Sequence, residues 1–228
     1  MIKDFLNDKE KINQAISIVE SVRKNIPRVP HNHINVIFQL REFMSENCKN
    51  YLEIGVYHGG SMITAMQSKY PCNFFGVDFF GEGPNGIFNK PGNQSVGALT
   101  PESVTQNVSR NNIHNHNFEL FQMDSQLEET SMFLKEKIKD GVDILMIDGC
   151  HEPHCIINDF NLYSPLVNKD GFICFDDYLF GEHIKETIDS LDLSEYEIIG
   201  CIDSSNNNDY LYESSNPSKN SSFIIRKK

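Results

Sequence analysis

The sequence predicts an α/β fold in which helices cover both faces of a doubly wound, mostly parallel sheet. From about residue 50 onward, short apolar runs alternate with longer amphipathic segments, and this alternation is typical of strand–helix–strand units. The runs are apolar at nearly every position, which indicates strands buried on both faces. At 228 residues with 39% hydrophobic residues, the chain is long enough to bury the core of a single domain.

Two helices are expected before the sheet. Apolar residues between Phe5 and Val22 recur at close to helical spacing, and Pro27 ends the segment because proline cannot continue a helix. A helix is therefore predicted over residues 4–24. A second apolar stripe predicts another helix over residues 34–46.

These helices form an N-terminal segment, residues 1–48, which we expect to cover the substrate or to contact another copy of the chain. His31 and His33 lie just before its second helix. They could reach a site from there, but we expect them to cap the helix. The remaining residues, 49–228, form the sheet and its helices, and the two parts are expected to fold as one domain.

Strand and helix segments alternate through residues 49–228. The strands are predicted at residues 51–56, 74–80, 118–124, 142–148, 171–177, 195–202 and 222–227. The helices between them are predicted at residues 60–69, 101–111, 128–139, 153–163 and 182–191.

Two stretches are predicted loops because they are rich in Gly, Pro, Asn and Ser. Residues 81–100 follow a strand end, on the rim where doubly wound folds bind ligands. This stretch is either a lid over the site or an inert insertion. Residues 204–221 separate the last two predicted strands.

The charge balance limits the kinds of partner. The chain carries a formal net charge of −12, which argues against nucleic acid or an anionic membrane, since both require a basic surface. We therefore expect a small-molecule partner, and the sequence leaves the oligomeric state open, a homo-oligomer included. The N-terminus has no apolar signal-peptide core, so a cytoplasmic location is expected.

The cysteines favour the same compartment. None of them forms a CxxC pair, and without an export signal we interpret them as reduced thiols. The six are Cys48, Cys72, Cys150, Cys155, Cys174 and Cys201.

The stretch MIDGCHEPHC, residues 146–155, resembles a zinc site at first sight. Cys150, His151, His154 and Cys155 fall within six residues. Structural zinc sites usually draw their ligands from two separated pairs, whereas these four are crowded between a strand end and the start of a helix. We therefore expect the thiols to take no part in the chemistry, and His154 to be a solvated residue of the first helical turn.

Acidic residues follow four consecutive predicted strands. In open α/β sheets, ligands bind at the carboxyl ends of the strands, so these side chains are candidates for one site. A glycine-containing turn, EIGVYHGGS, follows the first strand, and glycine allows the backbone to approach a ligand closely. The acids are Asp78, Asp124, Asp148 and the pair Asp176 and Asp177.

Together, EIGVYHGGS, VDFFGEG, IDGCH and YSPLVNKDGFICFDDY resemble a class I S-adenosylmethionine-dependent methyltransferase. The resemblance is nearest to the macrocin O-methyltransferase group of metal-dependent sugar O-methyltransferases, and it covers about residues 50–190. It implies a Rossmann-like, seven-stranded sheet whose last strand runs antiparallel. It also implies transfer of a methyl group from S-adenosylmethionine to a hydroxyl of a sugar or other small polyhydroxylated metabolite.

The resemblance assigns a role to each site residue. The methionine end of the cofactor would lie against Glu53, Gly55 and Ser61. Asp78 would bind the ribose hydroxyls, and Asp124 and Ser125 would flank the adenine. Asp148, also in contact with the cofactor, would hold Mg²⁺ or another hard divalent cation with Asp176 and Asp177. His151 would be the general base, although IDGCH departs from the commoner DGDxY form and leaves the base open.

The physical chemistry agrees with a cation. Three carboxylates meeting in one small site repel each other by about 4 kcal/mol per close pair at an effective dielectric constant of 20, so shared protons or a cation must neutralise them. Oxygen ligands suit Mg²⁺, Mn²⁺ or Ca²⁺. A bound cation would also make a hydroxyl lose its proton more easily.

Two other functions remain open. The first is a metal-dependent relative with oxidative chemistry, similar to cephalosporin hydroxylase-like proteins, in which iron would be held by two histidines and one carboxylate. Only His151 and His154 are expected near the carboxylates, which disfavours it. The second is a scaffold that binds the cofactor but has lost catalysis.

Overall fold

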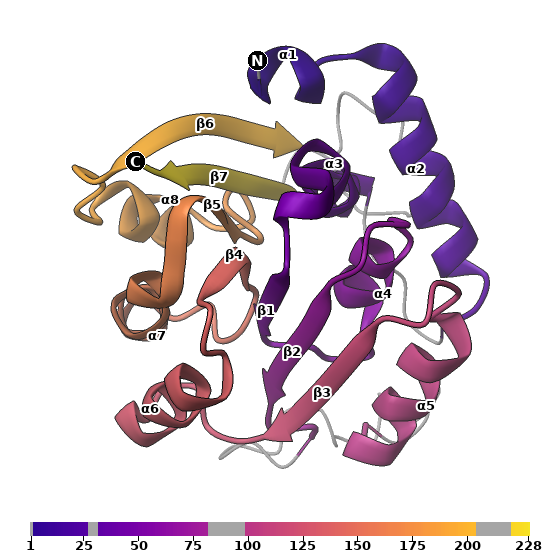
Figure 1. Ribbon diagram of the computed structural model, residues 1–228. Helices are drawn as coiled ribbons and strands as arrows, with labels where there is room; N and C mark the ends of the chain where they lie inside the picture. The colour runs from indigo at the N-terminus through magenta and orange to yellow at the C-terminus, as the bar shows by residue number, and fades with distance from the viewer. Residues whose placement is uncertain (1, 27–31, 82–98, 204–219) are drawn as a thin grey trace.

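The computed structural model describes residues 2–26, 32–81, 99–203 and 220–228 and contains one seven-stranded sheet (Figure 1). The strand order is β3-β2-β1-β4-β5-β7-β6. The strands are β1 (Asn50–Ile54), β2 (Asn73–Asp78), β3 (Asn117–Gln122), β4 (Val142–Ile147), β5 (Val167–Phe175), β6 (Tyr196–Asp203) and β7 (Ser221–Lys227).

The first five strands are parallel, and β7 lies antiparallel between β5 and β6. This arrangement confirms the predicted fold class and its antiparallel last strand. The chain moves outward from β1 through β2 to β3 and then returns to place β4 on the other side of β1. Adjacent central strands therefore lead away in opposite directions, and such a switch point is where doubly wound folds open a ligand crevice at the carboxyl edge.

The helices form two layers. In the described residues they are α1 (Ile2–Leu6), α2 (Lys9–Arg23), α3 (Asn35–Met44), α4 (Gly60–Met66), α5 (Pro101–Asn111), α6 (Glu128–Lys137), α7 (Pro153–Tyr163) and α8 (Glu182–Asp189). Figure 1 shows α4 and α5 on one side of the sheet and α6 and α7 on the other. Each layer encloses its own apolar core.

Alternate residues of the central strands supply the two cores. Tyr51 of β1 packs in the core under α3 and α4, whereas Leu52 and Ile54 pack in the core under α6, α7 and α8. All residues of β1 and β4 are buried. This two-sided burial explains why their sequences show continuous apolar runs instead of alternation.

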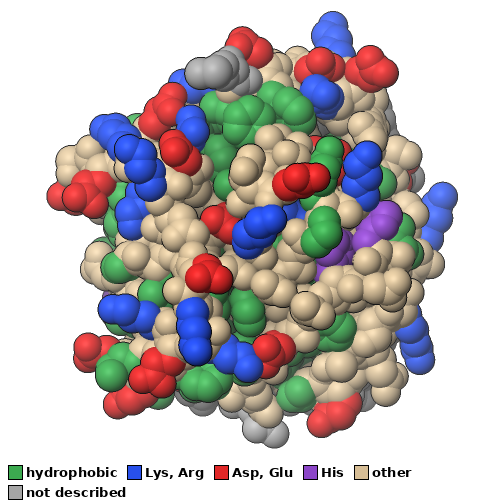
Figure 2. All heavy atoms as spheres, viewed as in Figure 1, with side chains coloured by type: hydrophobic (Ala, Val, Ile, Leu, Met, Phe, Trp, Pro, Cys, Tyr) green, Lys and Arg blue, Asp and Glu red, His purple; other side chains and the backbone are tan. Residues whose placement is uncertain are grey.

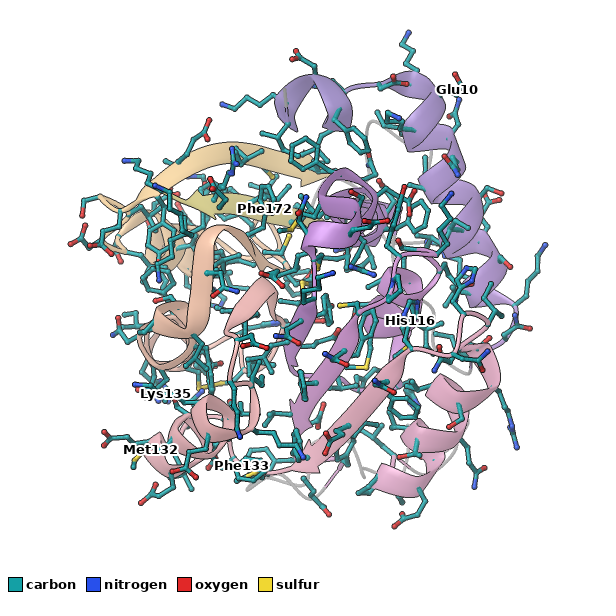
Figure 3. The ribbon with its side chains drawn as sticks, in the orientation of Figure 1. Glu10, His116, Met132, Phe133, Lys135 and Phe172 are labelled. Atoms are coloured by element: carbon teal, nitrogen blue, oxygen red, sulfur yellow. A yellow bond between two sulfur atoms is a disulfide. The ribbon has the colours of Figure 1, made fainter. Side chains whose placement is uncertain are left out.

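The N-terminal helices share the first of these cores. Arg41 of α3 is fully buried, and its guanidinium donates hydrogen bonds to the carbonyl oxygens of Cys48 and Tyr70. The ring of Phe43 packs edge-on against Phe172 of β5, with 6.1 Å between centroids (Figure 3). These contacts hold the segment before β1 firmly against the sheet.

At the opposite, amino edge of the sheet, a buried histidine links two elements. His116, labelled in Figure 3, lies just before β3, and its Nε2 is 3.0 Å from the carbonyl oxygen of Met66 and 2.9 Å from that of Ser68. Burial is the main cause that lowers the pKa of His116. This residue joins the end of α4 to β3, far from the carboxyl edge.

Most elements lie within a few residues of their predicted bounds, and two depart from the prediction more clearly. The helix predicted over residues 4–24 is split into α1 and α2, because the Asp8 carboxylate caps a new helix by accepting bonds from the backbone N–H groups of Glu10 and Lys11. Strand β5 starts at Val167, four residues before the predicted start, because Val167 already pairs with Val142 of β4, ahead of a register shift that leads to the pairing of Phe172 with Ile144.

None of the helices in the described parts of the chain has the length and apolar character that a membrane crossing requires. On the face shown in Figure 2, acidic and basic side chains are interspersed over the surface. His31, most of the predicted loop at residues 81–100, and nearly all of the loop at residues 204–221 lie outside the described residues.

Candidate active site

Backbone hydrogen bonds align the strand ends along the carboxyl edge. The N–H of Gly55 donates to the carbonyl of Val77, 2.9 Å away, and the N–H of Asp148 donates to that of Ile54, 2.8 Å away. The N–H of Asp176 continues the series with the carbonyl of Ile147 at 3.0 Å. The parallel strand pairing therefore places the glycine turn and the acidic residues at the carboxyl edge of the sheet, as the sequence predicts.

Gly55 is required by the packing of this edge. Its φ is 86°, and a Cβ at this position would lie 2.0 Å from the carbonyl oxygen of Asp148. No side chain fits there, so the turn after β1 can pass directly beside the end of β4. The close approach brings the turn and Asp148 together.

Glu53 and Ser61 meet under the glycine turn. Glu53 is fully buried, and its carboxyl group accepts hydrogen bonds from the hydroxyls of Tyr51, at 2.6 Å, and Ser61. Burial raises the pKa of Glu53 to about 8, although the two hydroxyl donors act in the opposite direction. The two residues expected at the methionine end of a cofactor are thus neighbours, and Glu53 is mostly protonated at pH 7.

Asp78 ties the ends of β1 and β2 together. Its carboxylate accepts the N–H of Tyr57 on one oxygen and the N–H of Phe80 on the other, each at 2.7 Å. Tyr57 and Phe80 have φ values of 51° and 48°, in the left-handed region. Because a carboxylate oxygen can accept two bonds, each oxygen keeps capacity for a ribose hydroxyl.

The loop after β3 is held by α7. The Asp124 carboxylate accepts the N–H of Gln126 at 2.9 Å, which makes a turn, and Tyr163 donates its hydroxyl to the Ser125 carbonyl at 2.7 Å. The buried Asp159 carboxylate accepts the side-chain amide of Gln126 at 2.7 Å. Asp124 and Ser125 therefore lie on a fixed loop at the same edge, where they remain the predicted adenine contacts.

Asp148, Asp176 and Asp177 form an acidic cluster at the ends of β4 and β5. Burial raises the pKa of Asp148 well above its ordinary value, and the charges of Asp176 and Asp177 raise it further. Burial, with the charge of Asp176, also raises the pKa of Asp177 to about 7. Asp177 has a φ of 55°, so the end of β5 takes a left-handed turn that presents both carboxylates.

His33 joins this cluster from the N-terminal segment, the alternative to helix capping that the sequence left open. Its side chain is 1% exposed, and its Nε2 lies 2.7 Å from Asp176 Oδ1. The capping role expected for His33 was therefore wrong. Burial raises the pKa of Asp176, but His33, followed by His151, outweighs this effect and the pKa is lowered. The two partners are 143 residues apart, and no local pattern signals the contact.

His151 lies across the cluster from the loop after β4. Its Nε2 is 3.6 Å from Asp148 Oδ1 and its Nδ1 is 3.7 Å from Asp177 Oδ2, and 37% of the side chain is exposed. Burial lowers the pKa of His151, against the opposite effect of Asp176. A half-exposed imidazole between two carboxylates can accept a proton from a ligand, so its role as base stays a prediction.

The cysteines beside His151 are paired. Cys150 and Cys155 form a disulfide with 5.7 Å between their Cα atoms, so the interpretation of all six cysteines as reduced thiols was wrong for this pair. The turn between β4 and α7 brings the two residues within the ordinary range of disulfide Cα separations. Sulfurs bonded to each other are not thiolate ligands, which excludes the four-ligand zinc site.

Within the described residues, one group of three side chains could hold a metal ion. Ligand atoms of His33, Asp176 and Asp177 all lie within 4.8 Å of one another. Asp148 lies beside this group, since Asp176 acts on its carboxyl group through a hydrogen bond. The group therefore contains two of the three predicted carboxylates together with the His33 imidazole, and Asp148 is not a member of it.

Comparisons with known proteins identify the family of the chain. Residues 52–178 match the model of a family described as a methyltransferase domain. An uncharacterized protein of Acanthamoeba polyphaga mimivirus is 33% identical over 172 residues, which are 75% of this chain and 71% of that protein.

Several solved structures have a similar fold. The O-methyltransferase TomG from Streptomyces achromogenes, solved with S-adenosylmethionine, has a TM-score of 0.58 and 11% identity over 97% of this chain and 92% of its own. An O-methyltransferase from Bacillus cereus, solved with S-adenosylhomocysteine, has a TM-score of 0.51 and 10% identity over 96% and 92%. An rRNA methylase from Streptococcus thermophilus has a TM-score of 0.55 and 9% identity over 86% and 96%. At these identities the likeness shows the shared fold alone.

Proposed function

Because the chain belongs to the family of methyltransferase domains, we propose that it transfers the methyl group of S-adenosylmethionine to a hydroxyl oxygen of a small molecule. One observation carries the proposal. The glycine turn with its buried Glu53–Ser61 pair lies at the same sheet edge as the cluster of Asp148, Asp176 and Asp177. This arrangement supports a cofactor site beside a site for an acceptor hydroxyl.

The cofactor would extend along the strand ends from β1 toward β3. Glu53, Gly55 and Ser61 would contact the methionine part, and the free lone pairs of Asp78 would accept the ribose hydroxyls. The adenine would lie against the loop of Asp124 and Ser125. This order follows the order of the strands, since β1, β2 and β3 are neighbours in the sheet.

The acidic cluster fits a divalent cation. Partly buried carboxylates this close are costly without a compensating charge, and the group formed by His33, Asp176 and Asp177 offers converging ligand atoms. We assign Asp148, Asp176 and Asp177 to the cation, with Mg²⁺ the ion expected from the sequence. When bound, the ion would supply positive charge that favours the deprotonated form of an acceptor hydroxyl.

His151 would receive the acceptor's proton. In the transfer, an acceptor oxygen forms a bond to the methyl carbon while the carbon–sulfur bond breaks and its electron pair stays on sulfur. The products are a methyl ether, S-adenosylhomocysteine and one proton. A positioned base contributes roughly 10²–10⁴-fold to such a step, and the lowered pKa of His151 leaves its imidazole free to accept that proton.

The acceptor is proposed to be a sugar or another small polyhydroxylated metabolite. The motifs resemble sugar O-methyltransferases, and the acidic side chains at the site disfavour acceptors that carry phosphate groups. A cytoplasmic location and independence from nucleic acid and membranes belong to the same proposal, and the oligomeric state is left open.

One observation favours a second candidate, an oxidative metalloenzyme. With His33, two imidazoles flank the carboxylates of Asp176 and Asp177, and two histidines with one carboxylate is the ligand set of non-haem Fe²⁺ oxygenases. Such an enzyme would consume oxygen and would not need S-adenosylmethionine.

The test is a transfer assay with methyl-labelled S-adenosylmethionine and a panel of sugars, glycosides and polyols. We expect labelled methyl ether from at least one acceptor, and loss of more than 100-fold of the rate in Asp148→Asn. The matched control is Asp140→Asn, which changes an exposed aspartate before β4. Cofactor binding without product across the panel would favour an inactive scaffold, and turnover that needs Fe²⁺ and oxygen but no cofactor would favour the second candidate.

A further inference from the structure

His33 places an imidazole beside the proposed cation site, to which only carboxylates were assigned as ligands. It belongs to the N-terminal segment, outside residues 52–178 of the methyltransferase domain match. Its imidazole is 1% exposed and lies 2.7 Å from Asp176, within the group of ligand atoms that also includes Asp177. A nitrogen donor is thus placed where oxygen ligands alone were expected.

The spacing of the three ligand atoms suits a common ion. Two ligands that each lie about 2.1 Å from an ion are about 3.0–4.2 Å apart. The atoms of His33, Asp176 and Asp177 lie within 4.8 Å of one another, so an ion could take them up with small side-chain movements. The short His33–Asp176 contact would then open to admit the ion.

The imidazole is held in place by its surroundings. His33 lies in a short 3₁₀ helix, Asn32–Ile34, which leads directly into α3. The first residues of α3, Asn35, Val36 and Ile37, are fully buried, and Arg41 of the same helix donates a hydrogen bond to the Cys48 carbonyl, just before β1. Because the imidazole is held beside the carboxylates, its nitrogen would influence which metal ion the site prefers.

We propose that His33 is a ligand of the metal centre and that it makes the site select a borderline first-row cation such as Mn²⁺, Fe²⁺ or Co²⁺ over Mg²⁺. Mg²⁺ favours oxygen ligands and retained water. Mn²⁺ also accepts oxygen ligands, but the affinity of a site that contains nitrogen rises from Mn²⁺ through Fe²⁺ to Co²⁺, and imidazole suits Fe²⁺ in particular. The inference rests on the proposed function, because it names the ion that the methyltransferase site holds.

The alternative role for His33 is a structural ion pair. In that role its imidazole would only compensate the buried charge of Asp176 and close the N-terminal segment over the strand ends. The two roles predict different metal binding, because a structural partner competes with the ion for Asp176 whereas a ligand adds to its affinity.

The first test measures metal binding by the full-length, EDTA-treated protein, without cofactor or acceptor. Free Mn²⁺ is followed by its electron paramagnetic resonance signal, and Mg²⁺ by competition against Mn²⁺. We expect the wild-type protein to bind Mn²⁺ at least tenfold more tightly than Mg²⁺. His33→Gln is expected to lose at least tenfold in Mn²⁺ affinity and most of this preference. The matched control, His154→Gln, changes an exposed histidine and is expected to behave as the wild type.

The second test includes proteins that keep His33, so it stays decisive even if His33→Gln fails to fold. Electron spin-echo modulation of bound Mn²⁺ should show nitrogen coupling in the wild type and in His151→Gln, and none in folded His33→Gln. Unchanged Mn²⁺ affinity in folded His33→Gln, or Mn²⁺ bound to His151→Gln without nitrogen coupling, would overturn the inference.

A parallel titration with S-adenosylmethionine separates this inference from the proposed function. Methyl transfer by a protein that binds Mg²⁺ at least as tightly as Mn²⁺ would overturn the metal inference and leave the function intact. Mn²⁺ bound through His33 in a protein that does not bind the cofactor would support the metal site and overturn the proposed function.

Discussion

Replacement of Glu53 by glutamine should make the protein more stable at neutral pH, even though a predicted cofactor contact is changed. Glu53 is fully buried, and the hydroxyls of Tyr51 and Ser61 donate hydrogen bonds to it. Burial raises the pKa of Glu53 to about 8. The amide of glutamine has the shape of the protonated acid but cannot ionise.

The size and direction of this stability change follow from the pKa of Glu53 in the folded and in the unfolded protein. Below pH 4.5, the ordinary pKa of a glutamate, both the folded and the unfolded state hold the proton. As the pH rises above 4.5, the unfolded chain loses its proton first. The free energy of unfolding therefore falls until the folded carboxyl titrates near pH 8. At about 1.4 kcal/mol per pKa unit, the total loss is about 5 kcal/mol, of which about 3.5 kcal/mol falls between pH 5 and pH 8.

The measurement is urea unfolding followed by circular dichroism at pH 5, 6, 7 and 8, without cofactor or metal. The free energy of unfolding of Glu53→Gln minus that of the wild type should rise by about 3.5 kcal/mol across this range. The control Glu136→Gln changes an exposed glutamate of α6 and should leave the difference flat within about 0.5 kcal/mol. A flat difference for Glu53→Gln would show that the carboxyl is ionised in the folded protein and would refute the reasoning.

Three further substitutions test the site. His151→Gln should lower kcat roughly 100-fold or more while the Kd for S-adenosylmethionine, measured by calorimetry, changes less than about twofold; an unchanged kcat would exclude His151 as the base. Gly55→Ala should cost more than about 3 kcal/mol in urea unfolding, because its Cβ would lie 2.0 Å from the Asp148 carbonyl oxygen, and a normal unfolding curve would contradict this packing. Tyr163→Phe removes the hydroxyl that donates to the Ser125 carbonyl, so we expect a loss of about 1 kcal/mol in stability and a several-fold higher KM for the cofactor; an unchanged KM would separate this loop from the adenine.

The fold could be predicted because its signals are local. Strands β1 and β4 are buried at every position, so their sequences had to be continuously apolar. Helix α5 begins with a capping box formed by Thr100 and Ser103 and has Pro101 as its first residue, and α7 begins at Pro153. Both helices have the predicted bounds. The break between α1 and α2 also had a local signal, the capping residue Asp8, which the helical periodicity obscured.

The candidate site could be predicted only where a strand led to it. Asp148 and Asp176 follow neighbouring parallel strands, so their proximity follows from the sheet order. His33 reaches Asp176 through the packing of α3, and this contact depends on tertiary structure that the N-terminal sequence does not reveal. The Cys150–Cys155 pair depends on the path of a single turn, and residue spacing alone does not specify that path.

The left-handed turns at the strand ends set thermal stability against catalytic activity in any engineering of this protein. Tyr57, Phe80 and Asp177 hold positive φ values, and each such non-glycine residue costs about 1 kcal/mol or more relative to glycine. Laboratory evolution under heat alone would therefore be expected to enrich glycine at all three positions. At Asp177 this gain would remove a carboxylate from the proposed cation site, so heat-selected lineages should lose activity there first.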